Sequence, residues 1–316
     1  QHLFDNGSPL FAGHLGFKIP RRQVEALAEA DLVLAVGTRL GDVPTQGYRF
    51  PEAPEPRQPL VQVHPDPAQL GRNHRCRLAL ACDPAAFLEA LAAAPDPAGA
   101  AARRDWAAGL NAVTQALRRG EPRQMPDGLD FGAVVAPLAA RAPHDTIVTT
   151  DAGNFSGWVH GHWRWDGTQE AIGCVGGAMG IGVPGAVAAA LRYPDRPVIG
   201  FVGDGGLLMT GSELATAVAC GAKPKIVVSS NGGYGTIRLH QERAYPERLA
   251  ATQLANPDFA LWARSFGLQA WSVATAEEIE PAVEAFLAAE GPALLAVKSS
   301  MEAISPYATI AQLRGG

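Results

Sequence analysis

The chain contains 316 residues, of which 47% are hydrophobic and 18% are charged, and its formal net charge is −5 at pH 7. The sequence has no dense basic run and no long apolar stretch, which argues against nucleic acid or a membrane as a partner. This composition predicts a soluble globular protein with two domains or one large one. Cys76, Cys82, Cys174 and Cys220 lack paired or metal-ligand spacing, so we expect reduced core cysteines in a cytoplasmic protein.

The first hundred residues follow the pattern of one half of a nucleotide-binding-like α/β domain. The chain opens without an initiating Met or a signal-peptide pattern, so we expect it to begin within a longer protein. After a loop-rich start, apolar strands alternate with short helices. Strands are predicted over residues 31–37, 60–63 and 78–81, and helices over residues 21–30 and 84–94. Residues 1–100 are therefore assigned to a partial Rossmann-like domain.

Residues 101–128 are expected to link this domain to a second one, and they include a helical segment over residues 103–119. From residue 129 to residue 316 the β/α pattern returns. Helices are predicted over residues 131–141, from 259, and over 276–289, and strands over residues 146–150 and 292–297. Residues 301–312 are expected to form a C-terminal tail that can cover a site.

The second domain centres on residues 197–241, where two apolar strands, 198–202 and 225–229, flank a helical stretch. Asp204 follows the first strand and Asn231 follows the second. Parallel strands joined by a right-handed crossover end at the same edge of their sheet. We therefore expect the two side chains to lie side by side, at the edge where open α/β sheets bind ligands.

These positions carry the chemistry of a metal-bound diphosphate site. Asp204 offers a carboxylate, Asn231 an amide oxygen, and Gly233 a carbonyl that no side chain screens, and Mg²⁺ prefers such oxygen ligands. Gly205 and Gly206 let backbone N–H groups approach phosphate oxygens at the start of the following helix. Either glycine-containing turn alone would more often be a simple turn. Their occurrence at matching strand ends favours the site.

The order Gly-Asp-Gly, then Asn, then Tyr-Gly at this interval resembles the signature of thiamine-diphosphate-dependent enzymes, and most of all the acetolactate synthase group. The resemblance implies an α/β fold in which a parallel sheet is flanked by helices, the thiamine-diphosphate-binding fold, with a partial Rossmann-like middle domain before it. It implies thiamine diphosphate and Mg²⁺ as cofactors, with the metal held by Asp204, Asn231 and the Gly233 carbonyl. The matching cofactor-binding positions in this region are Gly203, Asp204, Gly205, Gly206, Asn231, Gly233, Tyr234 and Gly235.

Two further segments extend the resemblance. Residues 151–158 are similar to a family loop that touches the diphosphate, which adds Gly153 and Asn154 as cofactor-binding positions, while Phe155 replaces a family His. Asn154 could instead stabilise the turn, and both interpretations stay open. Met179 matches the family residue whose side chain wedges under the cofactor and bends it. On residue type alone, Met179 would be a core residue that fills a gap.

Other positions depart from the family. Thr236 and His240 stand where a Met and a Trp line the acceptor pocket of acetohydroxyacid synthases, so branched-chain specificity does not follow. His240 is a candidate proton donor, or it faces solvent on its helix. In the first domain, VHPDPAQLGRN resembles a family segment. Some family members also carry a pattern associated with FAD binding, and of that pattern this chain keeps Arg39 but lacks the charged residues that accompany it. A domain that retains the fold without flavin is expected, and FAD stays open there as an unsupported alternative.

The resemblance implies a decarboxylase or carboligase that acts on a pyruvate-like 2-oxo acid and is a homodimer or homotetramer at full length. In the family, the activating Glu lies on a separate N-terminal domain. We therefore expect this chain to be the C-terminal portion of such an enzyme and inactive alone, with a natural split subunit as the alternative.

Three functions remain open. The first is an acetolactate-synthase-like carboligase that converts pyruvate to acetolactate. The second is a non-ligating decarboxylase or lyase, which Thr236 and His240 leave open. The third is a non-catalytic binding or assembly module, and the intact set of Asp204, Asn231 and Gly233 argues against it.

Overall fold

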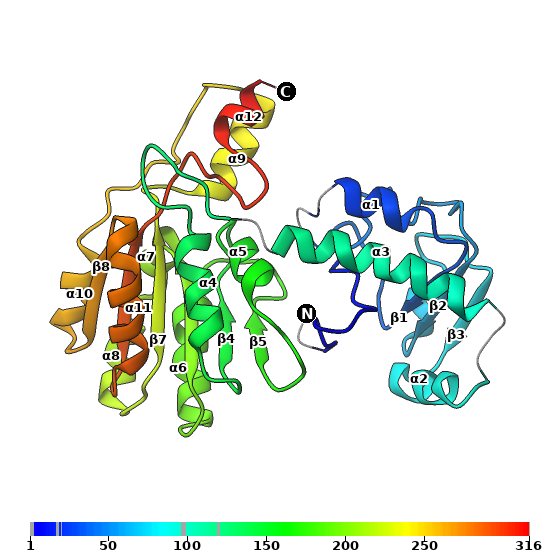
Figure 1. The fold of residues 1–316 in the computed structure, drawn as a ribbon, viewed down its shortest axis with the longest axis horizontal. Coiled ribbons are helices and arrows are strands. Elements are labelled where there is room, and N and C mark those ends of the chain that lie inside the picture. The colour runs from blue at the N-terminus through cyan, green and yellow to red at the C-terminus, as the bar shows by residue number, and fades with distance from the viewer. Residues whose placement is uncertain (1–2, 17–18, 20, 96–98, 119–120, 316) are drawn as a thin grey trace. The chain divides into compact units, whose positions relative to one another are not determined.

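The computed structural model describes residues 3–16, 19, 21–95, 99–118 and 121–315. The chain divides into two compact units: one comprises Ser8–Leu117, and the other combines Gln1–Gly7 with Arg118–Gly316 (Figure 1). The helix α3, Ala100–Arg118, covers much of the stretch expected to be a linker, and most of it falls in the first unit.

The first unit is built on a parallel sheet with strand order β1-β2-β3. Its small core contains Ala35, Leu40 and Leu60. Asp83 accepts hydrogen bonds from the first-turn N–H groups of α2, and Pro84 begins that helix. The remaining elements of this unit, in chain order, are α1 (Arg21–Leu27), β1 (Val33–Val36), β2 (Leu60–His64), η1 (Pro67–Gln69), β3 (Leu78–Ala81) and α2 (Pro84–Ala92).

The second unit is a six-stranded sheet in which all described strands are parallel, in the order β5-β4-β6-β7-β9-β8. Its strands are β4 (Ile147–Thr150), β5 (Glu170–Gly173), β6 (Val198–Gly203), β7 (Lys225–Ser230), β8 (Gln269–Val273) and β9 (Ala293–Lys298). Its helices are α4 (Gly132–Arg141), α5 (Ser156–His162), α6 (Gly182–Arg192), α7 (Asp204–Thr210), α8 (Glu213–Ala219), α9 (Gly235–Ala244), α10 (Phe259–Ser265), η2 (Ala276–Glu278), α11 (Ile279–Ala288) and α12 (Ile310–Arg314). The expected parallel sheet flanked by helices is confirmed.

Helices cover both faces of this sheet. Successive strand residues point to opposite sides, and the apolar residues on both sides pack against helices. Ile199 and Phe201 of β6 pack into a core cluster with α4, α5 and α11. Val198 and Val202 of the same strand pack into a second cluster with α6, α7, α8 and α10. Trp158, Trp163 and Trp165 belong to the first cluster and are therefore core residues of the second unit.

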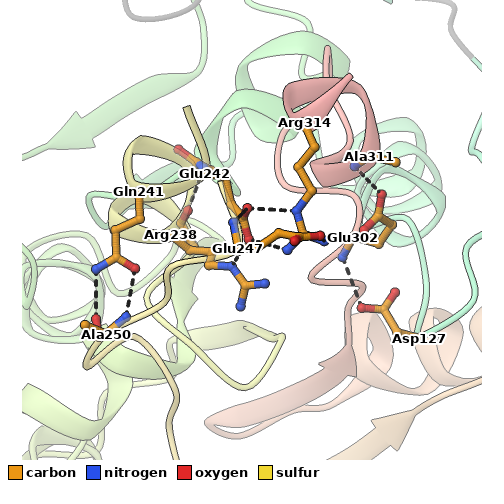
Figure 2. Close-up of polar contacts among 11 residues, drawn as sticks. Asp127, Arg238, Gln241, Glu242, Glu247, Ala250, Glu302, Ala311 and Arg314 are labelled. Atoms are coloured by element: carbon orange, nitrogen blue, oxygen red, sulfur yellow. Dashed lines mark hydrogen bonds and ion pairs between the residues drawn. The ribbon is translucent and has the colours of Figure 1, made fainter. Parts of the chain in front are cut away.

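Residues 300–314 form a C-terminal arm, and α12 at the end of this arm packs against α9. Asp127 accepts hydrogen bonds from the backbone N–H groups of Met301 (2.9 Å) and Glu302 (3.0 Å), and from the hydroxyl of Ser300. The buried Glu242 of α9 binds Arg314 of α12 (Figure 2). The expected tail is therefore an ordered segment that ends in a short helix.

Two points of composition are tested directly. None of the described helices is long and apolar enough to cross a membrane. All four cysteines are free, as expected. The prediction that they belong to the core is wrong for Cys220, whereas Cys76 packs against the small core of the first unit. Cys220 follows the last turn of α8 and is exposed, and the other three are only partly buried.

Candidate functional site

The carboxyl ends of β6 and β7 bring the two expected polar side chains into one place. β6 and β7 pair in parallel, with Gly203 opposite Ser229. Asp204 is the first residue of α7, directly after β6. The Gly232 N–H, next to Asn231, donates to Oδ2 of Asp204 at 2.7 Å. The two strand-end turns are therefore joined through the Asp204 carboxylate.

Asp204 is a buried carboxylate, with 3% of its surface exposed. Its Oδ1 accepts from the Gly205 N–H at 2.9 Å, and its Oδ2 accepts from Gly232 and from Nδ2 of Asn256 at 2.8 Å. Burial raises the pKa of Asp204, while the hydrogen bonds from Asn256 and the backbone oppose that rise. Within the described ranges, no Lys or Arg forms an ion pair with this carboxylate. A bound cation would supply the missing positive charge.

The loop after β7 has a fixed conformation. The Gly233 N–H donates to Oδ1 of Asn231 at 3.1 Å, and the Gly235 N–H donates to the Gly233 carbonyl at 2.9 Å, which makes Tyr234 the centre of an inverse γ-turn. Behind the loop, the Tyr234 N–H donates to the Thr252 carbonyl at 2.9 Å. A Cβ at Gly233 would lie 2.5 Å from that same carbonyl, so only glycine fits.

A cavity of about 250 Å³ opens at these strand ends. Every residue that the sequence predicts to bind the cofactor lines it. The rest of its wall consists of Ala152, Phe155, Gly177, Ser229, Thr236 and Ile237. Because Gly235, Thr236 and Ile237 open α9, the N-terminus of that ten-residue helix faces the cavity, and this is favourable for an anion.

The glycines of the first turn make room for close packing around the cavity. A Cβ on Gly205 would lie 2.5 Å from the Tyr234 ring and 3.1 Å from the terminal methyl of Met179. A Cβ on Gly206 would overlap Oδ2 of Asp151. Met179 is half-buried and lines the cavity, so its methyl, Tyr234 and Gly205 form one contiguous part of the wall.

Asp151 is a site residue that the sequence reasoning did not select. It directly follows β4 and is 3% exposed. Its Oδ1 accepts from the N–H groups of Gly180 (2.7 Å) and Ile181 (3.2 Å), which directly follow Met179. Burial raises the pKa of the Asp151 carboxyl, against the effect of these hydrogen bonds. The available signal was an Asp at the end of an apolar strand, the same pattern as at Asp204.

Asn154 lines the cavity and joins three segments of the chain. Its Nδ2 donates to the Ile304 carbonyl at 2.8 Å and to the Gly235 carbonyl at 3.3 Å, and its Oδ1 accepts from the Thr236 hydroxyl at 2.9 Å. Both ends of the amide are therefore engaged with protein groups. Phe155, at the position of the family His, packs edge-on against Phe131 in the core and lines the cavity with part of its surface.

The two residues expected to shape an acceptor pocket are separated. Thr236 lines the cavity, whereas His240, one turn further along α9, is exposed and does not line it. The described residues also contain no cluster of three His, Cys, Asp or Glu side chains that could hold a metal. A metal here would rest on one carboxylate and on neutral oxygens, which suits Mg²⁺ completed by phosphate and water. Asp204, Asn231 and Gly233 fit that donor set.

Comparison with known proteins identifies the class to which this fold and site belong. A family model described as thiamine pyrophosphate enzyme, C-terminal TPP binding domain, matches residues 151–297. A second model, thiamine pyrophosphate enzyme, central domain, matches residues 1–91. The chain belongs to the thiamine pyrophosphate enzyme family, named for the cofactor also called thiamine diphosphate, and the resemblance seen in the sequence is confirmed.

Several curated proteins resemble this chain along most of its length. The chain is 31% identical over 304 residues to an acetolactate synthase large subunit of Parasynechococcus marenigrum, covering 93% of this chain and 47% of the relative. It is 30% identical to the thiamine pyrophosphate-containing protein YdaP of Bacillus subtilis (92% and 49%) and to the acetolactate synthase isozyme 2 large subunit of Escherichia coli (92% and 51%). The chain thus spans about half the length of the curated relatives that it matches.

Proposed function

We propose that this chain supplies the diphosphate-binding half of a thiamine-diphosphate- and Mg²⁺-dependent enzyme that decarboxylates a pyruvate-like 2-oxo acid and joins the product to a second carbonyl. Support comes from the family, from relatives named as acetolactate synthases, and above all from one observation. The buried Asp204 carboxylate has no ion-pair partner among the described residues, yet it lies with Asn231 and Gly233 at the wall of a cavity.

In this proposal, each residue group has a defined task. Asp204, Asn231 and the Gly233 carbonyl hold Mg²⁺, and the glycine turns at residues 203–206 and 153 bring backbone N–H groups close to the diphosphate. Met179 and Tyr234 form the wall on which the rest of the cofactor rests. When bound, the thiamine cofactor accepts the electrons released as carbon dioxide leaves, so the protein binds, orients and excludes water.

Calorimetry on the full-length protein tests the cofactor assignment. Wild type should bind thiamine diphosphate with Mg²⁺, and Asp204→Ala should lose that binding. Asp195→Ala is a matched control, because Asp195 is exposed in the turn before β6. If Asp204→Ala binds the cofactor and metal as tightly as wild type, the metal assignment is wrong. If wild type itself binds neither, a non-catalytic module becomes the better description.

A second function is favoured by one feature of the cavity. Thr236 lines it and donates its hydroxyl to Asn154, so a small polar side chain stands where acetohydroxyacid synthases have a Met. The hydroxyl makes this part of the wall polar, so protonation of the decarboxylated product without ligation is the second candidate. Products formed from pyruvate separate the two: acetolactate indicates ligation, whereas acetaldehyde indicates simple decarboxylation.

A further inference from the structure

The segment after α9 lies along the back of the loop that carries the proposed metal ligands. Gly233 and Gln253 form an antiparallel bridge, and the Leu254 N–H donates to the Gly232 carbonyl at 2.9 Å. Together with the bond from Tyr234 to Thr252, these contacts fix the segment in register with the loop. Asn256, two residues beyond Leu254, is thereby brought to the Asp204 carboxylate.

Asn256 makes a polar contact at one end of its amide only. Its Nδ2 donates to Oδ2 of Asp204 at 2.8 Å and to the hydroxyl of Ser230 at 3.2 Å. Its Oδ1 is buried and finds no hydrogen-bond partner in the described part of the chain. Buried amide oxygens are normally paired, so this one requires an explanation.

The orientation of the amide follows from the charge beside it. If the amide of Asn256 were rotated, its oxygen would face an oxygen of Asp204, and two acceptors would repel each other. As long as Asp204 is ionised, Nδ2 must face the carboxylate and Oδ1 must point elsewhere. The oxygen is therefore left unpaired because the amide nitrogen of Asn256 donates to Asp204.

We propose that Asn256 is a positioning residue of the Mg²⁺ site: Nδ2 fixes the Asp204 carboxylate, and Oδ1 accepts a hydrogen bond from a water that arrives with the ion. This inference rests on the proposed function, because it requires Mg²⁺ at Asp204. Mg²⁺ loses its water reluctantly and usually keeps some of it when bound to protein, so an acceptor beside the ligand set has a use. Groups that orient metal ligands typically change metal affinity by about 10- to 100-fold when removed.

The test is a Mg²⁺ titration at saturating thiamine diphosphate in the full-length protein, by calorimetry and by the Mg²⁺-dependent rise in melting temperature. Asn256→Ala should raise the Kd for Mg²⁺ by about 10-fold or more. The matched control is Gln253→Ala, because Gln253 lies on the same segment and is exposed. Its bridge to Gly233 uses only the backbone, so this variant should bind as wild type does.

Two comparisons separate positioning from other roles. Asn256→Asp keeps an acceptor but loses the donor to Asp204, so this variant should also bind Mg²⁺ more weakly than wild type. Tighter binding would make residue 256 a direct ligand and would overturn the proposal. Ca²⁺ tolerates irregular coordination, so Asn256→Ala should weaken Mg²⁺ more than Ca²⁺. An equal loss for both ions would indicate a merely structural role and would overturn the proposal as well.

Failure of this inference differs from failure of the proposed function. If Asp204→Ala abolishes Mg²⁺-dependent binding while Asn256→Ala stays within about twofold of Gln253→Ala, the metal site stands and the role of Asn256 is refuted. If Asp204→Ala itself binds normally, the proposed function fails first. Both variants are compared at temperatures below their own unfolding transitions without ligand.

Discussion

The anchor of the C-terminal arm gives the sharpest quantitative prediction. Glu242 of α9 has no exposed side-chain surface and accepts from Arg314 twice, at 2.8 Å to each oxygen, and from Nε of Arg238 at 2.8 Å (Figure 2). Glu242→Gln removes the charge but keeps the shape of the side chain. We expect α12 and the arm before it to detach more often from α9.

The size of the effect follows from the pKa of Glu242. Hydrogen bonds from Arg314 lower this pKa from 4.5 to about 2, with Glu247 N–H and Arg238 adding to the effect. The full difference is worth roughly 3 kcal/mol in favour of the ionised, folded form. The Glu242 side chain is covered, but the side chain of its partner Arg314 is 34% exposed. Solvent screening reduces the gain, and we expect about 1–2 kcal/mol.

Hydrogen exchange of the arm measures this free energy locally. At neutral pH, Glu242→Gln should exchange the amides of residues 300–314 about 5- to 30-fold faster than wild type, after correction for intrinsic rates. Because the folded pKa is lowered, the stabilisation is complete above the ordinary value of 4.5 and is lost as pH falls toward about 2. The difference between variant and wild type should shrink across that window.

Glu247→Gln is the control for the arm, because Glu247 is 76% exposed and lies 3.6 Å from Arg314. It should leave exchange nearly unchanged. Equal protection in Glu242→Gln and wild type, or a difference between them that does not depend on pH, would refute the reasoning.

Three further predictions concern the walls of the cavity and the carboxylate of Asp151 behind Gly206. Gly206→Ala should lower the free energy of unfolding by about 1–3 kcal/mol in urea titrations, because its Cβ would overlap Asp151. Gly161→Ala is the control and should not lower it, because a Cβ there meets no other atom. Equal stability of the two variants would contradict the packing argument. Asp151→Ala should lower the free energy of unfolding by about 1–3 kcal/mol and speed hydrogen exchange of residues 174–181, since the Gly180 and Ile181 N–H groups lose their acceptor. Unchanged exchange in that segment would contradict this prediction. Asn154→Ala should speed hydrogen exchange around Ile304 by about fivefold and leave the affinity for thiamine diphosphate unchanged, because Asn154 bonds the Ile304 carbonyl. Weaker cofactor binding with normal exchange would mean that Asn154 acts on the cofactor instead.

The central strands were predictable from sequence, but the edges of the second sheet were not. β6, β7 and β9 are continuous apolar runs because both faces are covered by helices. β5 and β8 occupy the two edges, and each pairs with one neighbour only. Their sequences, EAIG and QAWSV, are short and lack a continuous apolar run, so neither was predicted.

Local motifs likewise predicted only part of the site. The positions of Asp204, Asn231 and Gly233 follow from strand-end topology, and the structure places them together. Asn256 and Asp127 were missed because they act on residues far along the chain: Asn256 lies 52 residues from Asp204, and Asp127 lies 174 from Met301. Such contacts depend on how loops fold back over the sheet, and no periodicity in the sequence marks them.

The charges around the cavity explain why we expect diphosphate binding to require the metal. Within the described ranges, no Lys, Arg or His lines the cavity, Asp204 brings a buried negative charge to its wall, and Asp151 lies behind Gly206. A diphosphate would meet backbone N–H groups but also carboxylate repulsion, and like charges about 4 Å apart cost roughly 4 kcal/mol at an effective dielectric constant of about 20. A divalent ion at Asp204 reverses the sign of that interaction.

Removing Mg²⁺ with a chelator should therefore raise the Kd of thiamine diphosphate by at least about 100-fold in calorimetry, which is close to 3 kcal/mol and below the full repulsion. Unphosphorylated thiamine is the matched ligand, because it lacks the charged group and should bind equally weakly with and without the metal. Asp204→Asn removes the repelling charge and a metal ligand together, so its diphosphate binding should depend far less on Mg²⁺. If wild type binds the diphosphate equally well in chelator, the cavity neutralises the anion by other means, and the electrostatic argument fails at Asp204 itself.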